Sequence, residues 1–182
     1  MGDHRAAMAG MLTIRPTKML ARRLGIELPA TPPAVANRVA DWCAHEFRTQ
    51  RFKYLIFFNT ASLYPVLTYA RGVTDDHELI ERLTEAMKLN LEGTKLEFQY
   101  QRWIAPELAA VQWAPIPDRS IMGSMNDLIL MAKYHLKYEG DSPVELSRKL
   151  AQAPMSMLGM RSPDRVFPTL GGPARPKISP SD

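Results

Sequence analysis

The sequence predicts an α+β fold, in which a small, mixed and mainly antiparallel sheet of about four or five strands is packed by helices. Three observations predict it. Hydrophobic residues make up 46% and charged residues 23% of the 182 residues, a balance typical of a globular domain. Short alternating or aromatic runs, which are typical of strands, occur between longer amphipathic stretches. Pro, Gly and Asn residues that favour turns separate these runs from one another.

The first strand and the first helix are indicated by their patterns and by the residues that end them. Residues 11–15 alternate between apolar and polar side chains before Pro16, which predicts a short strand. Thr17 is a suitable N-cap for a helix over residues 18–24, and Gly25 is a suitable stop for that helix.

The next segment is expected to be an amphipathic helix followed by a hairpin. Apolar side chains fall at helical spacing over residues 35–47, at Val35, Val39, Trp42, Cys43 and Phe47. Residues 52–58 are apolar and aromatic, and they predict a central strand. Its partner is expected over residues 63–69, where Pro65 favours an edge strand or a bulge.

The second half of the chain begins with a clearer helix. Asp75 and Glu78 have capping-box spacing and precede a single apolar face, so a helix is predicted over residues 74–91. Residues 96–103 alternate and predict a strand, with a helical continuation as the alternative. A further strand is expected over residues 111–116.

Two helices are expected next, each with a capping signal. Ser124 and Asp127 stand at capping-box spacing and predict the start of the first. Ser142, followed by Pro143 and by Glu145, predicts the start of the second, which ends near Ala153.

The predicted domain organisation follows from these elements. Residues 1–10 are expected to form a flexible leader, and residues 11–153 a single α+β domain. Residues 154–182 are rich in proline and predict a tail that is either disordered or loosely docked. Phe167 and Leu170 are the apolar side chains with which part of this tail would dock.

Charge and composition exclude several classes of function. Lys and Arg number 23 against 19 Asp and Glu, and this net charge of +4 permits a nucleic-acid or acidic partner without requiring one. The single cysteine, Cys43, excludes an internal disulfide framework and a multi-cysteine zinc site. No two histidines have metal-ligand spacing and no glycine-rich phosphate loop occurs, so neither a metal nor a cofactor is predicted. Apolar runs fall far short of the roughly 20 residues of a membrane helix, and a cytoplasmic location without membrane contact is expected.

One polar segment, residues 118–127, is a candidate anion site. A strand is expected to end before it and a helix to begin within it, so free N–H groups at Ser124 would face an anion. Arg119 would clamp a phosphate or carboxylate. The full candidate set is Arg119, Ser120, Gly123, Ser124, Asn126 and Asp127. The structural alternative is that Ser124 only caps the helix and Arg119 only pairs with a nearby carboxylate.

A second candidate is a basic surface for a macromolecular partner. Its residues are Arg15, Lys18, Arg22, Arg23, Arg48, Arg51 and Lys53. If the two groups converge, they form a patch that faces phosphates. Interleaved aromatic residues in the 52–58 strand suit base stacking, although the RNA-recognition octamer is absent. The structural alternative is a solvated helix face beside buried strand aromatics.

Four motifs resemble those of an uncharacterised prokaryotic family, a domain of unknown function. They are Thr17-Lys18, Asp41-Trp42, the strand that ends in Phe57-Phe58-Asn59, and residues 119–127 with the sequence R-S-I-M-G-S-M-N-D. The resemblance covers about residues 11–138, and the chain departs from it in the longer region over residues 96–103 and in the Pro-rich tail. It implies a bacterial or phage cytosolic protein, with some relatives linked to mobile-element passenger proteins, and no established activity.

These observations favour a non-enzymatic binding module that recognises a protein or nucleic-acid partner in a mobile-element, phage or defence setting. The alternative is a small enzyme or ligand binder that uses Arg119 and the helix start at Ser124, with Asp118 or Asp127 as base or metal ligand. A homo-oligomer is the third possibility, because Met155, Met157 and Met160 would give a soft contact surface.

Overall fold

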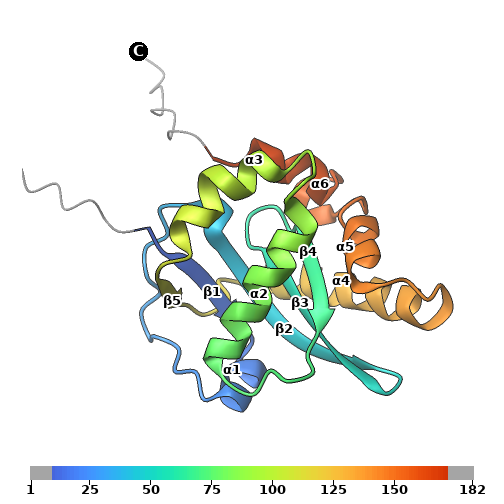
Figure 1. The fold of residues 1–182 in the computed structure, drawn as a ribbon, viewed down its shortest axis with the longest axis horizontal. Coiled ribbons are helices and arrows are strands. Elements are labelled where there is room, and N and C mark those ends of the chain that lie inside the picture. Colours follow the sequence, from blue (N-terminus) through green and yellow to red (C-terminus); the bar gives the residue numbers. More distant parts are fainter. Residues whose placement is uncertain (1–9, 172–182) are drawn as a thin grey trace, which may run out of the picture.

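One five-stranded sheet lies at the centre of the chain in the computed structural model, which describes residues 10–171 (Figure 1). The strand order is β4-β3-β2-β1-β5. The strands are β1 (Leu12–Pro16), β2 (Asp41–Thr49), β3 (Phe52–Asn59), β4 (Pro65–Tyr69) and β5 (Val111–Trp113). Antiparallel ladders of eight and five residue pairs join β2, β3 and β4, whereas parallel ladders of four and three pairs join β1 to β2 and to β5. The predicted mixed and mainly antiparallel α+β sheet is therefore confirmed.

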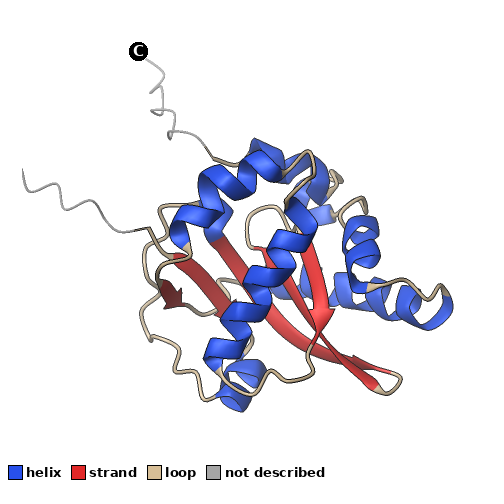
Figure 2. Cartoon of the chain, in the orientation of Figure 1, coloured by secondary structure: helices blue, strands red, loops and turns tan. Residues whose placement is uncertain are grey.

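Helices cover both faces of this sheet (Figure 2). They are α1 (Lys18–Leu24), α2 (Asp76–Leu91), α3 (Glu97–Gln99), α4 (Arg119–Tyr138), α5 (Pro143–Leu150) and α6 (Pro163–Val166). In Figure 1, α2 crosses in front of the sheet and α4 lies behind it. Within residues 10–171, none of these helices combines the length and the apolar character that a membrane crossing requires.

Side-chain alternation along the strands divides the core into two layers. Leu12 and Ile14 of β1 pack with Trp42 of β2 in the layer that contains α1 and α2. The neighbouring Cys43 belongs to the opposite layer, in which Ile56 and other strand residues pack against α4 and α5. The sheet is thus buried on both sides by helices that approach from different parts of the chain.

The helix predicted over residues 35–47 is wrong. A short 3-10 turn over Arg38–Ala40 leads into strand β2 instead. Three consecutive side chains of this strand, Trp42, Cys43 and Ala44, are fully buried because β2 is central and covered on both faces. Such a strand loses the apolar-polar alternation that identifies strands in a sequence, and its apolar run imitates a helical face.

The strand predicted over residues 96–103 is also wrong, and the helical alternative is correct. The segment forms α3 and then a π-helical turn over Tyr100–Ile104. Leu96, Tyr100 and Ile104 recur every four residues and are all buried, whereas Phe98 is 69% exposed. The second strand predicted in this half, over residues 111–116, is shorter than expected: β5 ends at Trp113.

The disordered alternative for the predicted tail is wrong for residues 154–171, which pack against the sheet domain. Phe167 is fully buried, and its ring centroid lies 5.0 Å from that of Tyr64 and 5.9 Å from that of Trp42. Gln99 donates from Nε2 to the carbonyl oxygens of Phe167 (3.2 Å), Pro168 (2.6 Å) and Leu170 (3.1 Å). Docking through Phe167 and Leu170 is therefore confirmed, while the expected leader over 1–9 and the last part of the tail, 172–182, lie outside the described residues.

Replacing Phe167 with alanine is expected to lower the free energy of unfolding by about 3–5 kcal/mol, because it opens a cavity between Trp42 and Tyr64. Denaturant unfolding of the full chain measures this loss. The matched control is Phe98→Ala, whose ring is 69% exposed, and its effect should stay within about 0.5 kcal/mol. Equal effects of the two substitutions would show that the tail does not contribute to the core.

Candidate functional site

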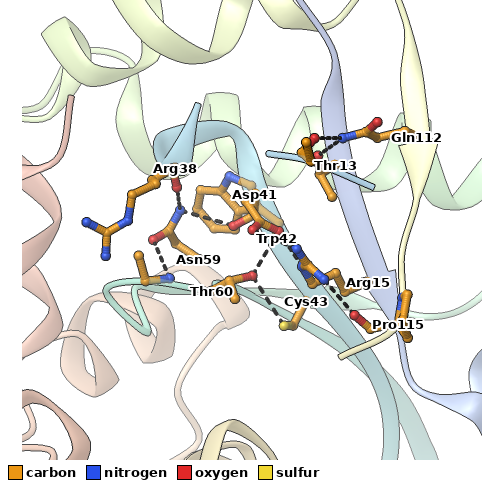
Figure 3. Close-up of polar contacts among 12 residues, drawn as sticks. Thr13, Arg15, Arg38, Asp41, Trp42, Cys43, Asn59, Thr60, Gln112 and Pro115 are labelled. Carbon is orange, nitrogen blue, oxygen red and sulfur yellow. Dashed lines mark hydrogen bonds and ion pairs between the residues drawn. The ribbon is translucent and has the colours of Figure 1, made fainter. Parts of the chain in front are cut away.

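A buried ion pair joins the two central parallel strands (Figure 3). Arg15 of β1 donates from Nε to Asp41 Oδ1 at 2.7 Å and from Nη2 to Asp41 Oδ2 at 3.2 Å. Its third contact is from Nη1 to the Pro115 carbonyl oxygen, at 2.6 Å. Arg15 is 6% exposed and Asp41 is 7% exposed, so solvent hardly screens their attraction. Arg15 is therefore not available to the macromolecular partner that the sequence analysis assigned to it.

Two further side chains extend this network to the turn after β3. The Thr60 hydroxyl lies 3.1 Å from Asp41 Oδ1 and 3.4 Å from the sulfur of Cys43. Burial raises the pKa of the Cys43 thiol to about 12, and the thiol is accordingly unreactive near neutral pH. The ion pair and its neighbours thus have a structural role: they tie β1, β2, the β3–β4 turn and the segment after β5 together.

Asn59, part of the motif on which the family resemblance rests, also has a structural role. Its amide nitrogen donates to the carbonyl oxygens of Arg38 (2.9 Å) and Asp41 (3.1 Å). Its amide oxygen accepts from the backbone N–H of Ser62 at 3.0 Å and from the Ser62 hydroxyl at 2.9 Å. Because Asn59 is fully buried, these bonds fix the turn between β3 and β4 from the inside.

A crevice of about 530 Å³ opens beside this network, at the carboxyl ends of β1 and β5. These strands are parallel neighbours, but the helices that follow them diverge: α1 packs into the layer with α2, and α4 into the opposite layer. Ligands of open sheets with parallel strands bind where consecutive connections leave to opposite faces in this way. The volume falls in the range of small-molecule sites.

The wall of the crevice is mainly apolar, with polar groups at its rim. The apolar lining includes Met19, Leu28, Ile116, Met122 and Met125. The polar lining consists of Thr17, Lys18, His45, Asp118, Arg119 and Asn126. Within residues 10–171, neither Lys18 nor Arg119 forms an ion pair with a carboxylate. The arrangement suits a ligand with an apolar body and one anionic group.

One histidine, His45, lines the crevice, and the side chain of Thr17 orients its ring. Its Nδ1 lies 2.9 Å from Thr17 Oγ1, which also accepts the backbone N–H of Leu20 and so caps α1. The contact between the Thr17 hydroxyl and Nδ1 forms in either neutral tautomer of the imidazole, and in both it holds the ring in a fixed orientation. Burial lowers the pKa of His45, and the ring is therefore neutral near pH 7.

The helix start predicted at Ser124 is wrong, and with it the anion site at that residue. Helix α4 begins at Arg119, and Asp118 is its N-cap, with Oδ1 accepting the backbone N–H groups of Ser120 (2.8 Å) and Ile121 (3.1 Å). Ser124 lies one turn further on, is buried, and donates to the Ser120 carbonyl oxygen. The carboxylate of Asp118 thus already occupies the helix end that the sequence analysis offered to a ligand.

The other residues of the candidate anion set are divided between the crevice and the helix surface. Arg119 and Asn126 line the crevice, as the ligand-binding hypothesis requires. The Ser120 hydroxyl donates to Asp118, and Gly123 and Asp127 are exposed on α4 without lining the crevice. Hydrogen bonds from Ser120 and from the backbone of α4 lower the pKa of Asp118, which makes it a poor general base.

The basic set is also divided by the fold. Lys18 lines the crevice, whereas Arg48, Arg51 and Lys53 lie at the far end of the β2–β3 hairpin. Glu46 is half-buried and lies between the basic residues of α1 and those of the hairpin. It pairs with Arg23 of α1 at 2.5 Å and with Lys53 of β3 at 3.3 Å. Arg22 is exposed on α1. A single convergent patch of all seven residues does not form.

One cluster of titratable side chains, at the C-terminal end of α4, was missed by the sequence analysis although its members lie within seven consecutive residues. Ligand atoms of His135, Glu139 and Asp141 lie within 4.8 Å of one another. Lys149 of α5 donates to Asp141 at 2.8 Å and to Glu139 at 3.0 Å, and these bonds lower the pKa of both carboxyl groups. The lysine ammonium supplies the cation here, so the cluster joins α4 to α5 as a salt-bridge network.

Replacing Arg15 with methionine is expected to cost about 3–5 kcal/mol of unfolding free energy, because Asp41 is left as a buried charge without its partner. Denaturant unfolding measures the loss. The double variant Arg15→Met/Asp41→Asn should cost less than the sum of the two single variants. The control Arg23→Met breaks the more exposed pair with Glu46 and should cost at most about 1 kcal/mol. Additive losses in the double variant would contradict a direct Arg15–Asp41 interaction.

The lowered pKa of His45 predicts that the fold loses stability as the solution is acidified. Below the ordinary histidine pKa, the unfolded chain takes up a proton that the folded state resists, so the free energy of unfolding falls between about pH 7 and pH 5. Denaturant unfolding at both pH values measures this, and His45→Asn should reduce the fall. The matched control is His77→Asn, whose side chain is 76% exposed on α2. If the control changes the pH dependence as much as His45→Asn, the assignment to His45 fails.

Comparison with known proteins gives the family of the chain but no function for the crevice. A family model described as "Domain of unknown function (DUF6933)" matches residues 13–166. No curated protein and no solved structure matches the chain. The matched range includes the buried ion pair and every residue that lines the crevice. Since the match covers most of its length, the chain belongs to the DUF6933 family.

Proposed function

We propose that the protein binds a small molecule with an apolar body and one carboxylate or phosphate group in the crevice between α1 and α4. The observation that carries this proposal is the placement of Arg119 and Lys18 at the rim of a mainly apolar crevice at the sheet's switch point. The apolar body would lie against Met122, Met125 and Ile116. The guanidinium of Arg119 would pair with the anion.

The proposal takes up the ligand-binding alternative of the sequence analysis in a changed form. The anion is bound by side chains rather than by the helix end, because Asp118 caps that end. Asn126, about two turns further along α4, adds an amide that donates or accepts hydrogen bonds in the crevice. The mobile-element, phage or defence setting and the cytoplasmic location stay predictions.

An enzyme that acts on such a ligand is a second form of this proposal, and one observation favours it. His45 is a neutral histidine that lines the crevice, and its orientation is set by Thr17. A histidine of this kind transfers a proton to or from a bound substrate near pH 7. His45, and not Asp118 or Asp127, would be the acid or base of the reaction.

Arg119→Met is expected to weaken binding of 1-naphthoate by about tenfold to a hundredfold, because it removes a hydrogen bond between charged groups worth about 1.5–3 kcal/mol. Isothermal titration of the full chain measures this. Binding of 1-naphthalenemethanol, which lacks the carboxylate, should change less than about twofold. The control is Arg22→Met, which removes an exposed arginine of α1 that does not line the crevice.

Three results would contradict the proposal. The first is an absence of 1-naphthoate binding to the unaltered chain at millimolar ligand. The second is equal weakening of the acid and the alcohol by Arg119→Met, which would indicate a damaged fold rather than a lost ion pair. The third is an effect of Arg22→Met as large as that of Arg119→Met.

A further inference from the structure

A cluster of cations surrounds the far end of the β2–β3 hairpin, away from the crevice. Five of the eight residues that line a surface hollow of about 600 Å³ are cationic, and none is acidic. The cations are Arg48, Arg51, Lys53, Arg71 and Arg82. Together with Phe52 and Tyr69 of the same lining, they are called the hairpin patch below. Figure 1 shows that the hairpin extends beyond the rest of the sheet.

The strand register concentrates positive charge at this point. Arg48 of β2 stands directly opposite Lys53 of β3 in the antiparallel ladder. Like charges in directly opposed positions destabilise a sheet. Glu46 offsets part of the charge, since it lies 3.3 Å from Lys53, but it is shared with Arg23. A bound anion would remove the repulsion that remains.

The cations of the hairpin patch differ in how far the fold uses them. Arg82 donates to the carbonyl oxygens of Tyr69 and Arg71 and lies 3.9 Å from Glu85. In the described part of the chain, Arg48, Arg51 and Arg71 form no ion pair with a carboxylate. Three arginines from two segments, the β2–β3 hairpin and the turn after β4, thus face solvent around one hollow. That spread suits a ligand that carries several anionic groups in a row rather than a single ion.

Two exposed aromatic rings lie within the same patch. Phe52 is 47% exposed and Tyr69 is 46% exposed, and their ring centroids are 6.3 Å apart. The Arg51 guanidinium lies 5.8 Å from the Phe52 ring centroid. Paired rings beside cations are the composition of sites that stack bases and hold phosphates. An acidic peptide would use the arginines but has no general use for the rings.

The faces of the hairpin favour a flexible ligand. Opposed residues share a face, so Arg48 and Lys53 lie on one face, while Tyr54 and Tyr69 lie on the other. β4 is an edge strand, and α5 covers it at Leu67, where Ser147 accepts the backbone N–H, but leaves Tyr69 exposed. A ligand that contacts cations and rings together has to pass around this open edge. A single strand of nucleic acid bends in this way and offers unpaired bases, whereas a duplex is stiff and its bases are paired.

We propose that the hairpin patch binds single-stranded nucleic acid, with the phosphates on Arg48, Arg51 and Arg71 and bases stacked on Phe52 and Tyr69. This function is separate from ligand binding in the crevice. It keeps the nucleic-acid partner of the sequence analysis, with three of its seven basic residues and with Phe52 from the aromatic strand residues named there. Tyr69, Arg71 and Arg82 are added by the structure.

Fluorescence anisotropy of a fluorescein-labelled 20-nucleotide oligo-dT, titrated with the full chain at low salt, tests the proposal. The double variant Phe52→Ala/Tyr69→Ala should weaken binding at least about tenfold, because stacking contributes roughly 1–3 kcal/mol per base. Arg48→Gln/Arg51→Gln should lower the slope of log affinity against log salt by about 1.4, the value for two phosphate contacts on a single strand.

The matched control is Tyr134→Ala/Tyr138→Ala on α4. It also removes two exposed, neighbouring rings beside a cation, since Lys137 lies 4.8 Å from the Tyr138 ring centroid. This variant should bind oligo-dT like the unaltered chain, as should Arg119→Met. Thermal unfolding followed by circular dichroism identifies any variant that has lost its fold.

Four outcomes would overturn the proposal. They are no binding of oligo-dT, tighter binding of a duplex of equal length, equal loss in the Tyr134→Ala/Tyr138→Ala control, and competition by a polyglutamate peptide as strong as by unlabelled oligo-dT. The last outcome would assign the patch to an acidic protein partner. Loss of oligo-dT binding in Arg119→Met would instead place the nucleic acid in the crevice.

Discussion

The ion pair between Arg15 and Asp41 is the interaction on which the geometry of this protein depends. It lies between the two parallel strands at the centre of the sheet, and it also holds the Pro115 carbonyl oxygen. Three of the donor groups of one guanidinium are thereby used to join β1, β2 and the connection from β5 to α4. A neutral side chain of similar size would pack in the same space, but it would not fix the connection. The ion pair thus holds the segment that leads from β5 to α4 against the two parallel strands beside the crevice.

The crevice itself is a consequence of chain topology more than of any single residue. Two parallel neighbours, β1 and β5, send their helices to opposite faces, and the space between the helix starts cannot be filled by either. Thr17, Lys18, Asp118 and Arg119 line the crevice because each lies at the N-terminal end of α1 or α4. This explains why Lys18 and Arg119, which are about a hundred positions apart in the sequence, line the same opening.

Much of the fold followed from local signals, and the two main errors have different causes. Helices α2 and α5 were identified by capping residues such as Asp75 and Ser142, which act within a few positions of the helix start. Strand β2 was mistaken for a helix because burial on both faces removes alternation. The start of α4 was placed at Ser124 because Gly123 resembled a turn, although the Pro117-Asp118 pair was the better capping signal.

The candidate site was only partly visible in the sequence. Arg119 and Asn126 were proposed as members of an anion site, and the structure places both in the lining of the crevice. They were noticed because a polar segment between a strand and a helix is a local pattern. His45 was missed, because its place in the crevice depends on the parallel register of β1 with β2, which no short pattern encodes. The burial of Arg15 could not be predicted either, because its partner Asp41 is 26 residues away in the sequence.

The connection between β1 and β5 also has a consequence for how the chain folds. Strands β2, β3 and β4 are joined by short turns, so they pair over small separations in the sequence. The contact of Arg15 with Pro115 closes a loop of 100 residues, and the entropy lost on closing a loop grows with its length. The antiparallel unit of β2, β3 and β4 is therefore held by contacts between residues close in sequence, whereas the crevice is formed by residues far apart in sequence. The crevice, which is proposed to bind a small molecule, therefore has a higher entropic cost of assembly than the strands that carry the hairpin patch.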